Sequence, residues 1–382
     1  MDDCASRCMM KGIEDTLCRL PADIRKKTTI GVQLPDGLKR YASWIAEHIE
    51  THWGCDVIIS GDNCYGVCDV SEDLVRLGAD FILHFGHARL RMITECPRKS
   101  SENKKGNTLR WKTRKGSVFF IEMRIPTSAL PKDELAKLLE DAERAVASES
   151  TKIEKSGANN RTKNTRTKTS VILFTTVQYL DFLPIVKDYL QKRGYSVKIG
   201  KPKRRAAYRG QVLGCDLSAV ASSVGNTGVP VYIGTGEFHP RGAALATNKR
   251  IVIIDIEQRK VRTIYPELDL FLKRRWGLIE TALKSKRYGI IVSSKTGQSR
   301  IDLAKHLHKL ALKAGKKSDI IILGRITPDA LMDLGYDAYV STACPRIALD
   351  DYGNYSRPLL TPQEFEIILG TRKWVDYAID IF

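Results

Sequence analysis

The stretch "TTIGVQLPDGLKRYASWIAEHIETHWGCDVIISGD" (residues 28–62) decides the fold, because it contains one complete strand–helix–strand unit. Residues 28–37 are an apolar run that ends in a Pro/Gly turn, which is typical of a buried strand. Residues 38–54 have helical periodicity and end in a glycine, and residues 55–62 are again a strand pattern. A strand, a crossover helix and a second strand predict a parallel pair within one sheet.

The same order occurs twice more, and each copy adds a third apolar strand. The other two units span residues 169–201 and 287–325, and the third strands span residues 79–90, 229–242 and 336–347. Apolar strands that alternate with amphipathic helices indicate parallel sheets covered on both faces. The sequence therefore predicts an α/β fold of three similar small α/β domains, whose loops at the carboxyl ends of strands can point at one central site.

The 382 residues divide naturally between these three copies. We expect a first α/β domain at residues 1–149, a basic linker with the second α/β domain at residues 150–265, and the third α/β domain at residues 266–382. Helix 132–149 and the tract that follows it should bridge the first and second copies. No stretch approaches the 18 apolar residues of a membrane span, and the N-terminus does not resemble a signal peptide, so we expect a cytoplasmic protein.

The formal net charge is +18, and much of the excess lies in two tracts, residues 97–117 and 150–170. Both tracts are rich in Lys, Arg, Asn, Ser, Thr and Gly, which predicts loops. Two interpretations of the charge remain open at this point: solvated surface loops, or a nucleic-acid or acidic-protein partner. No RNA-binding motif accompanies the tracts, so solvated loops are favoured and a nucleic-acid partner is not expected.

Nine cysteines in a chain without secretory signals make a disulfide framework improbable and a metal or redox site a candidate. Cys64 and Cys68 lie four apart, but Ser71 occupies the position where a local Cys-x3-Cys-x2-Cys cluster loop would have its third thiol. Cys68, Cys215 and Cys344 instead follow strands of the first, second and third copy. Three soft thiolates could bind an iron–sulfur cluster and leave one iron open, although coincidence explains the spacing equally well.

Seven sequence blocks together resemble one known family. They are "VQLPDGL" (32–38), "GDNCYGVCDV" (61–70), "LGADFILHFGHA" (77–88), "GQVLGCD" (210–216), "YIGTGEFHP" (232–240), "VSSKTGQ" (292–298) and "STACPRIALDD" (341–351). Their order is similar to that in the archaeal 2-(3-amino-3-carboxypropyl)histidine synthases of diphthamide biosynthesis, a non-canonical radical S-adenosylmethionine family. The resemblance covers about residues 28 to 370.

The resemblance implies a complete reaction scheme. One thiol from each domain, Cys68, Cys215 and Cys344, would bind a four-iron four-sulfur (4Fe-4S) cluster. S-adenosylmethionine would be the co-substrate, and its 3-amino-3-carboxypropyl group would pass as a radical to C2 of a histidine imidazole on translation elongation factor 2, with release of methylthioadenosine. The family implies a homodimer and an external electron donor.

Further residues are candidates for substrate contacts in that scheme. Arg346 could hold the substrate carboxylate, with an ion pair to Asp350 or Asp351 as the alternative. Gln33, Asp36 and Gln298 occupy turns that could also contact S-adenosylmethionine.

Four other side chains are expected to line the pocket: His84, His87, His239 and Glu237. His84 and His87 form His-x2-His, but a metal pair is not favoured because no further ligand stands nearby in the sequence. Glu237 or Asp69 could orient or deprotonate the imidazole of the partner protein. Two alternatives to the enzyme are a non-catalytic iron–sulfur protein and a basic RNA-binding protein with structural thiols.

Overall fold

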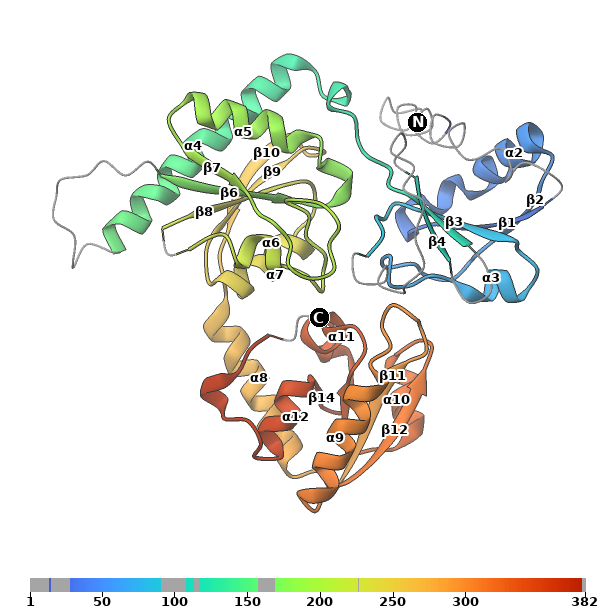
Figure 1. Ribbon diagram of the computed structural model, residues 1–382. Coiled ribbons are helices and arrows are strands. Elements are labelled where there is room, and N and C mark those ends of the chain that lie inside the picture. The colour runs from blue at the N-terminus through green and yellow to red at the C-terminus, as the bar shows by residue number, and fades with distance from the viewer. Residues whose placement is uncertain are drawn as a thin grey trace. The chain divides into compact units, whose positions relative to one another are not determined.

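The computed structural model describes residues 14, 28–90, 108–112, 117–156, 169–225 and 227–379. These residues form three sheets, and the chain divides into two compact units, residues 1–266 and 267–382. The first unit contains two of the sheets and the second unit contains the third (Figure 1). Each sheet is built on parallel strands with helices packed against it, so the predicted fold class is confirmed.

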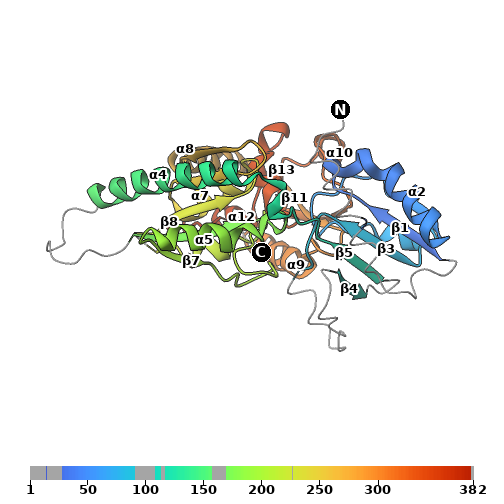
Figure 2. The same cartoon turned by 90° about the horizontal axis from the view of Figure 1, so that it is seen from above.

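The first sheet has the strand order β2-β1-β3-β5-β4, and only its edge strand β4 runs antiparallel. Figure 2 shows β1, β3, β5 and β4 of this sheet. Ile30 and Val32 of β1 pack with α2, whereas Gly31 between them faces Leu74 of α3. This alternation follows from the two-residue period of a strand. The elements are β1 (Thr29–Gln33), η2 (Asp36–Tyr41), α2 (Ala42–Trp53), β2 (Asp56–Ile59), α3 (Glu72–Arg76), β3 (Phe81–Phe85), β4 (Thr108–Lys112) and β5 (Ser117–Ile121).

The second sheet has the order β10-β9-β8-β6-β7, with β10 as its antiparallel edge. Val171 and Leu173 of β6 face α4 and α5, while Ile172 and Phe174 face α6 and α7 on the other side (Figure 1). The elements are η4 (Thr127–Ala129), α4 (Lys132–Ser156), β6 (Ser170–Thr175), η5 (Val177–Tyr179), α5 (Phe182–Lys192), β7 (Ser196–Ile199), α6 (Ser218–Ala221), β8 (Val229–Ile233), α7 (Phe238–Thr247), β9 (Ile251–Asp255) and β10 (Lys260–Ile264).

The third sheet, in the second unit, is parallel throughout in the order β12-β11-β13-β14. A buried ion pair between Arg275 and Glu364 (2.5 Å) ties α8 to α12 behind it. The elements are α8 (Leu268–Leu283), β11 (Arg287–Ser293), α9 (Ile301–Lys313), β12 (Lys317–Leu323), α10 (Pro328–Leu334), β13 (Ala338–Ser341), α11 (Pro345–Asp350), η6 (Tyr352–Asn354), β14 (Leu359–Leu360), α12 (Pro362–Ile368) and η7 (Trp374–Asp376).

The prediction that both basic tracts are loops was wrong in part. Residues 108–112 of the tract 97–117 form β4, and residues 150–156 of the other tract complete α4. The sequence of β4, "TLRWK", alternates apolar and cationic residues, so its strand period was hidden by the high Lys/Arg content. The other residues of both tracts, apart from those at the beginnings of β5 and β6, lie outside the described residues.

Helix α4 packs on the second sheet, where Leu138, Ala142 and Val146 share a core cluster with strands β6, β8 and β9. The domain limits given above stay predictions. In the part of the chain that the structure describes, no helix is long and apolar enough to cross a membrane.

Candidate functional site

Cys68 lies in the connection between β2 and α3, and Gln33 fixes that connection. Gln33 is the last residue of β1 and is buried. Its side-chain Nε2 donates to the backbone oxygen of Asp69 (2.6 Å), and its Oε1 accepts from the backbone N–H of Ser71 (3.0 Å). One amide at a strand end therefore holds the backbone on the carboxyl side of the thiol, and the position of Cys68 depends on the first sheet.

Two histidines stand beside the same amide. Nδ1 of His84, in β3, lies 2.9 Å from Gln33 Oε1, and its Nε2 lies 2.9 Å from Nδ1 of His87 and 3.8 Å from Sγ of Cys64. Burial, with His87 nearby, holds the pKa of His84 well below its usual value, and burial lowers the pKa of His87 to about 4. Both rings are therefore uncharged at neutral pH.

Cys215 follows β7 in the second sheet, next to a fully buried aspartate. The Asp216 carboxylate accepts from the backbone N–H groups of Arg205 (2.7 Å), Ala206 (2.8 Å) and Ser218 (3.0 Å), and from the Ser218 hydroxyl (2.6 Å). Arg205 Nη1 also lies 3.7 Å from Cys215 Sγ. A guanidinium beside a thiol favours the thiolate, which is the form that binds metals.

Contacts inside the first unit connect the two thiol loops. Leu213, two residues before Cys215, and Cys68 both pack on the core cluster that contains Val67. The hydroxyl of Tyr208 donates to the carboxylate of Glu122, which follows β5. Burial raises the pKa of Glu122, although its bonds to Tyr208 and to Arg124 act in the opposite direction. These contacts join the first sheet to the loop that leads to Cys215.

Cys344 follows β13 in the second unit and is the N-cap residue of α11. Arg300 donates to the backbone oxygens of Thr342 (2.6 Å) and Ala343 (3.3 Å), directly before the thiol. Arg275 donates to the backbone oxygen of Ala348 (2.7 Å) in the same helix. Two guanidinium groups therefore fix the backbone on both sides of this cysteine.

The residues predicted to contact S-adenosylmethionine are distributed over both units. Gln33 and Asp36 lie at the end of β1, where Asp36 forms an ion pair with Lys39 (2.8 Å). Gln298 is buried in the turn after β11. Arg346 bonds to Asp350 (2.5 Å), the ion pair that was weighed against its substrate role. No contact in either unit tests the substrate assignments, and they stay predictions.

The four residues predicted to line the pocket lie at two different positions in the first unit. His84 and His87 join Gln33 beside the Cys68 loop, whereas Glu237 and His239 lie at the start of α7. Glu237 bonds to Arg241 (2.5 Å) and to Arg262, and these bonds, led by that from Arg241, lower its pKa. Glu237 is therefore a carboxylate at neutral pH.

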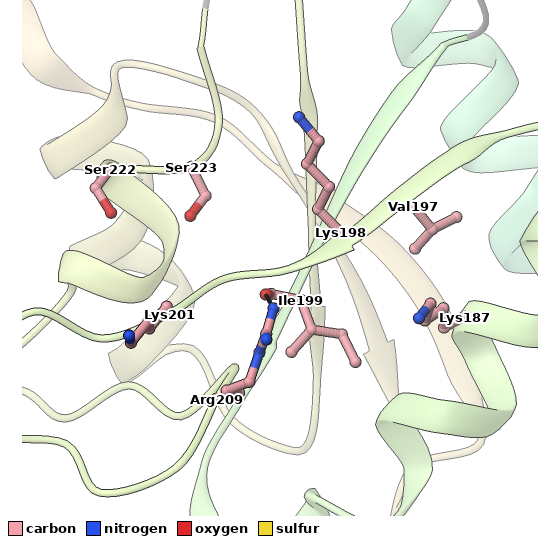
Figure 3. Close-up of a pocket in the computed structure, with 8 residues that line it drawn as sticks. All are labelled: Lys187, Val197, Lys198, Ile199, Lys201, Arg209, Ser222 and Ser223. Atoms are coloured by element: carbon pink, nitrogen blue, oxygen red, sulfur yellow. Dashed lines mark hydrogen bonds between the residues drawn. The ribbon is translucent and has the colours of Figure 1, made fainter.

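A cavity of about 610 Å³ lies along β7, away from these candidates. Figure 3 shows Ser222, Ser223 and Lys201 on one side of Ile199, with Lys187 and Val197 on the other. Lys198 and Arg209 complete its lining, which contains no thiol, imidazole or carboxylate. This cavity can attract anions, but it lacks the groups that the predicted chemistry requires, so the thiol loops form the candidate site.

Several residues that organise the site were missed in the sequence. They are Asp216, Arg205, Arg300, Glu122 and Tyr208. The repeated Cys–Asp pair at 68–69 and 215–216 was a signal for Asp216, because a carboxylate next to a strand-end thiol is well placed to bond loop N–H groups. Arg300 and Glu122 had no such signal, since their partners lie 42 and 86 residues away.

Comparisons with known proteins bear on this arrangement. The family model of diphthamide synthesis proteins matches residues 34–101 and 146–378. The 2-(3-amino-3-carboxypropyl)histidine synthase of Pyrococcus horikoshii is 32% identical over 350 residues, which cover 91% of this chain and 87% of that protein. Subunit 1 of the corresponding synthase of Saccharomyces cerevisiae is 28% identical over 346 residues, 89% of this chain and 70% of that protein.

Solved structures agree with the sequence matches. The crystal structure of Dph2 from Pyrococcus horikoshii has a TM-score of 0.73 at 28% identity, over 98% of this chain and 93% of that chain. A second structure of that protein, described as containing a 4Fe-4S cluster, has a TM-score of 0.70 at 27% identity over the same shares. The resemblance drawn from the seven sequence blocks is confirmed: the chain belongs to the family of diphthamide synthesis proteins.

Proposed function

We propose that this chain is a 2-(3-amino-3-carboxypropyl)histidine synthase, which acts in the first step of diphthamide biosynthesis. The bond between the sulfonium sulfur of S-adenosylmethionine and its 3-amino-3-carboxypropyl carbon breaks, and that carbon bonds to C2 of a histidine imidazole. Methylthioadenosine leaves, and the hydrogen of C2 is lost as a proton together with one electron, which balances the electron that starts the cleavage. Family membership and 32% identity over 91% of the chain to a protein of that name support the proposal.

Cys68, Cys215 and Cys344 are the proposed ligands of a 4Fe-4S cluster. The donor chemistry fits, because none of the described cysteines forms a disulfide and each of these three follows a parallel strand of a different sheet. That one-thiol-per-sheet arrangement is the observation that carries the proposal. When bound, the cluster would supply the electron that starts cleavage of the sulfonium C–S bond.

The residues around the thiols have definite tasks in this proposal. Gln33, Asp216 and Arg300 each fix the backbone next to one cysteine, as their hydrogen bonds require. Arg346 would exchange its bond to Asp350 for the carboxylate of S-adenosylmethionine, which a guanidinium can hold with two parallel bonds.

Other predicted contacts keep their roles as proposals. Gln33, Asp36 and Gln298 would contact S-adenosylmethionine, and His84, His87, His239 and Glu237 would line the pocket. Glu237 is charged at neutral pH and could orient the imidazole that accepts the new bond. Translation elongation factor 2 would be the protein substrate of a cytoplasmic homodimer that takes electrons from an external donor.

The test is an anaerobic assay on the chain of 382 residues. The protein is reconstituted with iron and sulfide, reduced with dithionite and mixed with S-adenosylmethionine and elongation factor 2. We expect methylthioadenosine and a mass increase on the factor. Cys68→Ala, Cys215→Ala and Cys344→Ala should each lower the cluster absorbance and abolish product.

Cys55→Ala is the matched control, because Cys55 is a buried core cysteine that bonds to the Trp53 backbone oxygen (3.6 Å). It should keep both cluster and product. A full cluster without methylthioadenosine from the wild-type chain would support a non-catalytic iron–sulfur protein. A wild-type chain that retains no cluster would remove the enzyme proposal and leave the basic RNA-binding alternative.

A further inference from the structure

We propose that Cys64, His84 and His87 form a second metal site, for Zn²⁺ or a similar divalent transition-metal ion, separate from the proposed cluster ligands. Their three donor atoms lie within 4.8 Å of one another. The thiol and the His84 ring are buried, and Nε2 of His84 lies 2.9 Å from Nδ1 of His87. The His-x2-His pair thereby gains the third ligand that no sequence spacing indicated.

The orientation of His84 is set by a chain of hydrogen bonds. The side-chain amide of Gln33 has its Nε2 against the backbone oxygen of Asp69 and its Oε1 against the backbone N–H of Ser71. Its Oε1 is therefore an acceptor, so Nδ1 of His84 must carry the proton in their 2.9 Å bond. The lone pair of Nε2 then points at Cys64 and His87, as in metal sites where a second partner fixes the ligand tautomer.

Two of the three distances between the donors are close to those around a tetrahedral ion. Bond lengths of about 2.3 Å to sulfur and about 2.0–2.1 Å to nitrogen place two nitrogens about 3.3 Å apart, and sulfur and nitrogen about 3.5 Å apart. The observed separations are 2.9 Å between the nitrogens and 3.8 Å between Cys64 Sγ and His84 Nε2. Shifts of a few tenths of an ångström satisfy both, and the third pair, Cys64 Sγ and the His87 nitrogen, lies within 4.8 Å and would close on the ion.

The donor set selects the class of ion. One thiolate and two neutral imidazoles suit Zn²⁺, Co²⁺ or Fe²⁺ and disfavour Mg²⁺ and Ca²⁺, which prefer oxygen. Binding would deprotonate Cys64 and release one proton, and three protein ligands leave a fourth position for water. Gly86, with φ of +79°, turns the chain between the two histidines so that His87 returns toward β3.

The site would also act on the neighbouring loop. Cys64 and Cys68 share the connection that follows β2, and Gln33 already fixes its far end at Asp69 and Ser71. An ion on Cys64 would bind the near end of the same connection to β3. Cys68 would then lie between two anchors, one a hydrogen-bonded amide and the other a metal.

The experiment uses the chelator-treated, cluster-free chain of 382 residues with Co²⁺ as an optical probe, under anaerobic conditions. We expect one equivalent of Co²⁺ to give thiolate-to-cobalt charge-transfer absorbance with tetrahedral ligand-field bands, and Zn²⁺ to displace it. Cys64→Ser should remove the charge-transfer band, and both Cys64→Ser and His87→Gln should weaken Zn²⁺ binding by at least about 100-fold. Cys68→Ala should keep the band.

A second measurement separates this site from the proposed cluster. After reconstitution with iron and sulfide, Cys64→Ser should keep the iron–sulfur absorbance that Cys68→Ala loses. A cobalt–thiolate band that survives in Cys64→Ser, or that disappears in Cys68→Ala, overturns the proposal. Loss of the iron–sulfur absorbance in Cys64→Ser also overturns it, because Cys64 would then serve the cluster. Without metal, Cys64→Ser and His87→Gln should have the same melting temperature as the wild-type chain, which shows that both variants fold.

Discussion

The loops of Cys68 and Cys215 carry the same Cys–Asp pair, but different side chains provide most of their hydrogen bonds. In the first loop, Gln33 reaches out of β1 and bonds the backbone at Asp69 and Ser71. In the loop of Cys215, the carboxylate of Asp216 accepts four hydrogen bonds from its own loop and from the start of α6. The first loop is therefore held mainly by a side chain of its sheet, with one bond from the Tyr65 N–H to its own Asp69 carboxylate (3.4 Å). The second loop combines its own carboxylate with backbone bonds of Gly210 and Val212 to Thr175 of β6.

The difference shows that a repeated dipeptide does not imply a repeated role. Both aspartates are buried, at 3% and 0% exposure. A buried carboxylate needs donors, and the second loop supplies backbone N–H groups two residues after Asp216 and ten and eleven residues before it. The first loop is short and enters α3 three residues after Asp69, so a side chain from the neighbouring strand contributes to its support.

The largest effect is expected from Asp216→Ala. It leaves three backbone N–H groups and one hydroxyl without their acceptor in a buried position, which should cost roughly 3 to 5 kcal/mol of unfolding free energy. Urea denaturation measures the loss, and hydrogen exchange should rise in residues 203–218 but not in 61–71. Asp216→Asn keeps one acceptor oxygen and should lose less.

Asp188→Ala is the matched control, since Asp188 is exposed on α5, and it should change the unfolding free energy by less than about 0.5 kcal/mol. Equal exchange in both loops of the Asp216→Ala protein would show that the carboxylate does not support the second loop in particular.

Sequence patterns were sufficient to predict the repeated strands. They were insufficient to predict which helix packs on which sheet. The unit at residues 28–62 has strong strand and helix periods, and β1, α2 and β2 form where those periods lie. Strand β4 was missed because cationic residues occupy its polar positions. The placement of α4 on the second sheet depends on which sheet its apolar stripe meets, and periodicity contains no such information.

The sequence predicted where the three cysteines of the candidate site lie, but not which residues surround them. Cys68, Cys215 and Cys344 each follow a strand as expected, although their role as ligands stays a prediction. His84 and His87 were visible as a pair, but Cys64 lies 20 residues from His84 in the sequence. Their approach requires β3 to lie beside β1 in the first sheet, with Gln33 across from His84, a register that only the fold provides.

A smaller effect is expected from Gln33→Leu. The substitution preserves the volume but removes the partners of the Asp69 oxygen, the Ser71 N–H and the buried Nδ1 of His84, at a cost of roughly 2 to 4 kcal/mol. The cost is below that of Asp216→Ala because fewer groups lose a partner and Ser71 is only half-buried. Hydrogen exchange should rise in residues 61–71 and stay unchanged in 203–218, the reverse of Asp216→Ala. Gln191→Leu, on the exposed face of α5, is the control. If Gln33→Leu leaves exchange in 61–71 unaltered, the first loop does not depend on its sheet.

The smallest effect concerns Glu122, which joins the two regions through Tyr208. Burial raises the pKa of Glu122, so the folded chain holds a proton that the unfolded chain releases. This contribution to stability is complete below the ordinary pKa of 4.5 and is lost as pH rises through the raised value. Glu122→Gln has no such proton, so the stability of the wild-type chain relative to the variant should increase as pH falls from 7 toward 5.

Urea denaturation of both proteins at several pH values gives this difference directly. Glutamine keeps an oxygen that can accept from Tyr208, so the contact between the first sheet and the second loop persists in the variant. A difference that shrinks on acidification would mean that the ion pair with Arg124 (2.9 Å) dominates over burial. Arg124 would then hold Glu122 as a carboxylate in the folded chain, and raising the salt concentration should weaken that ion pair.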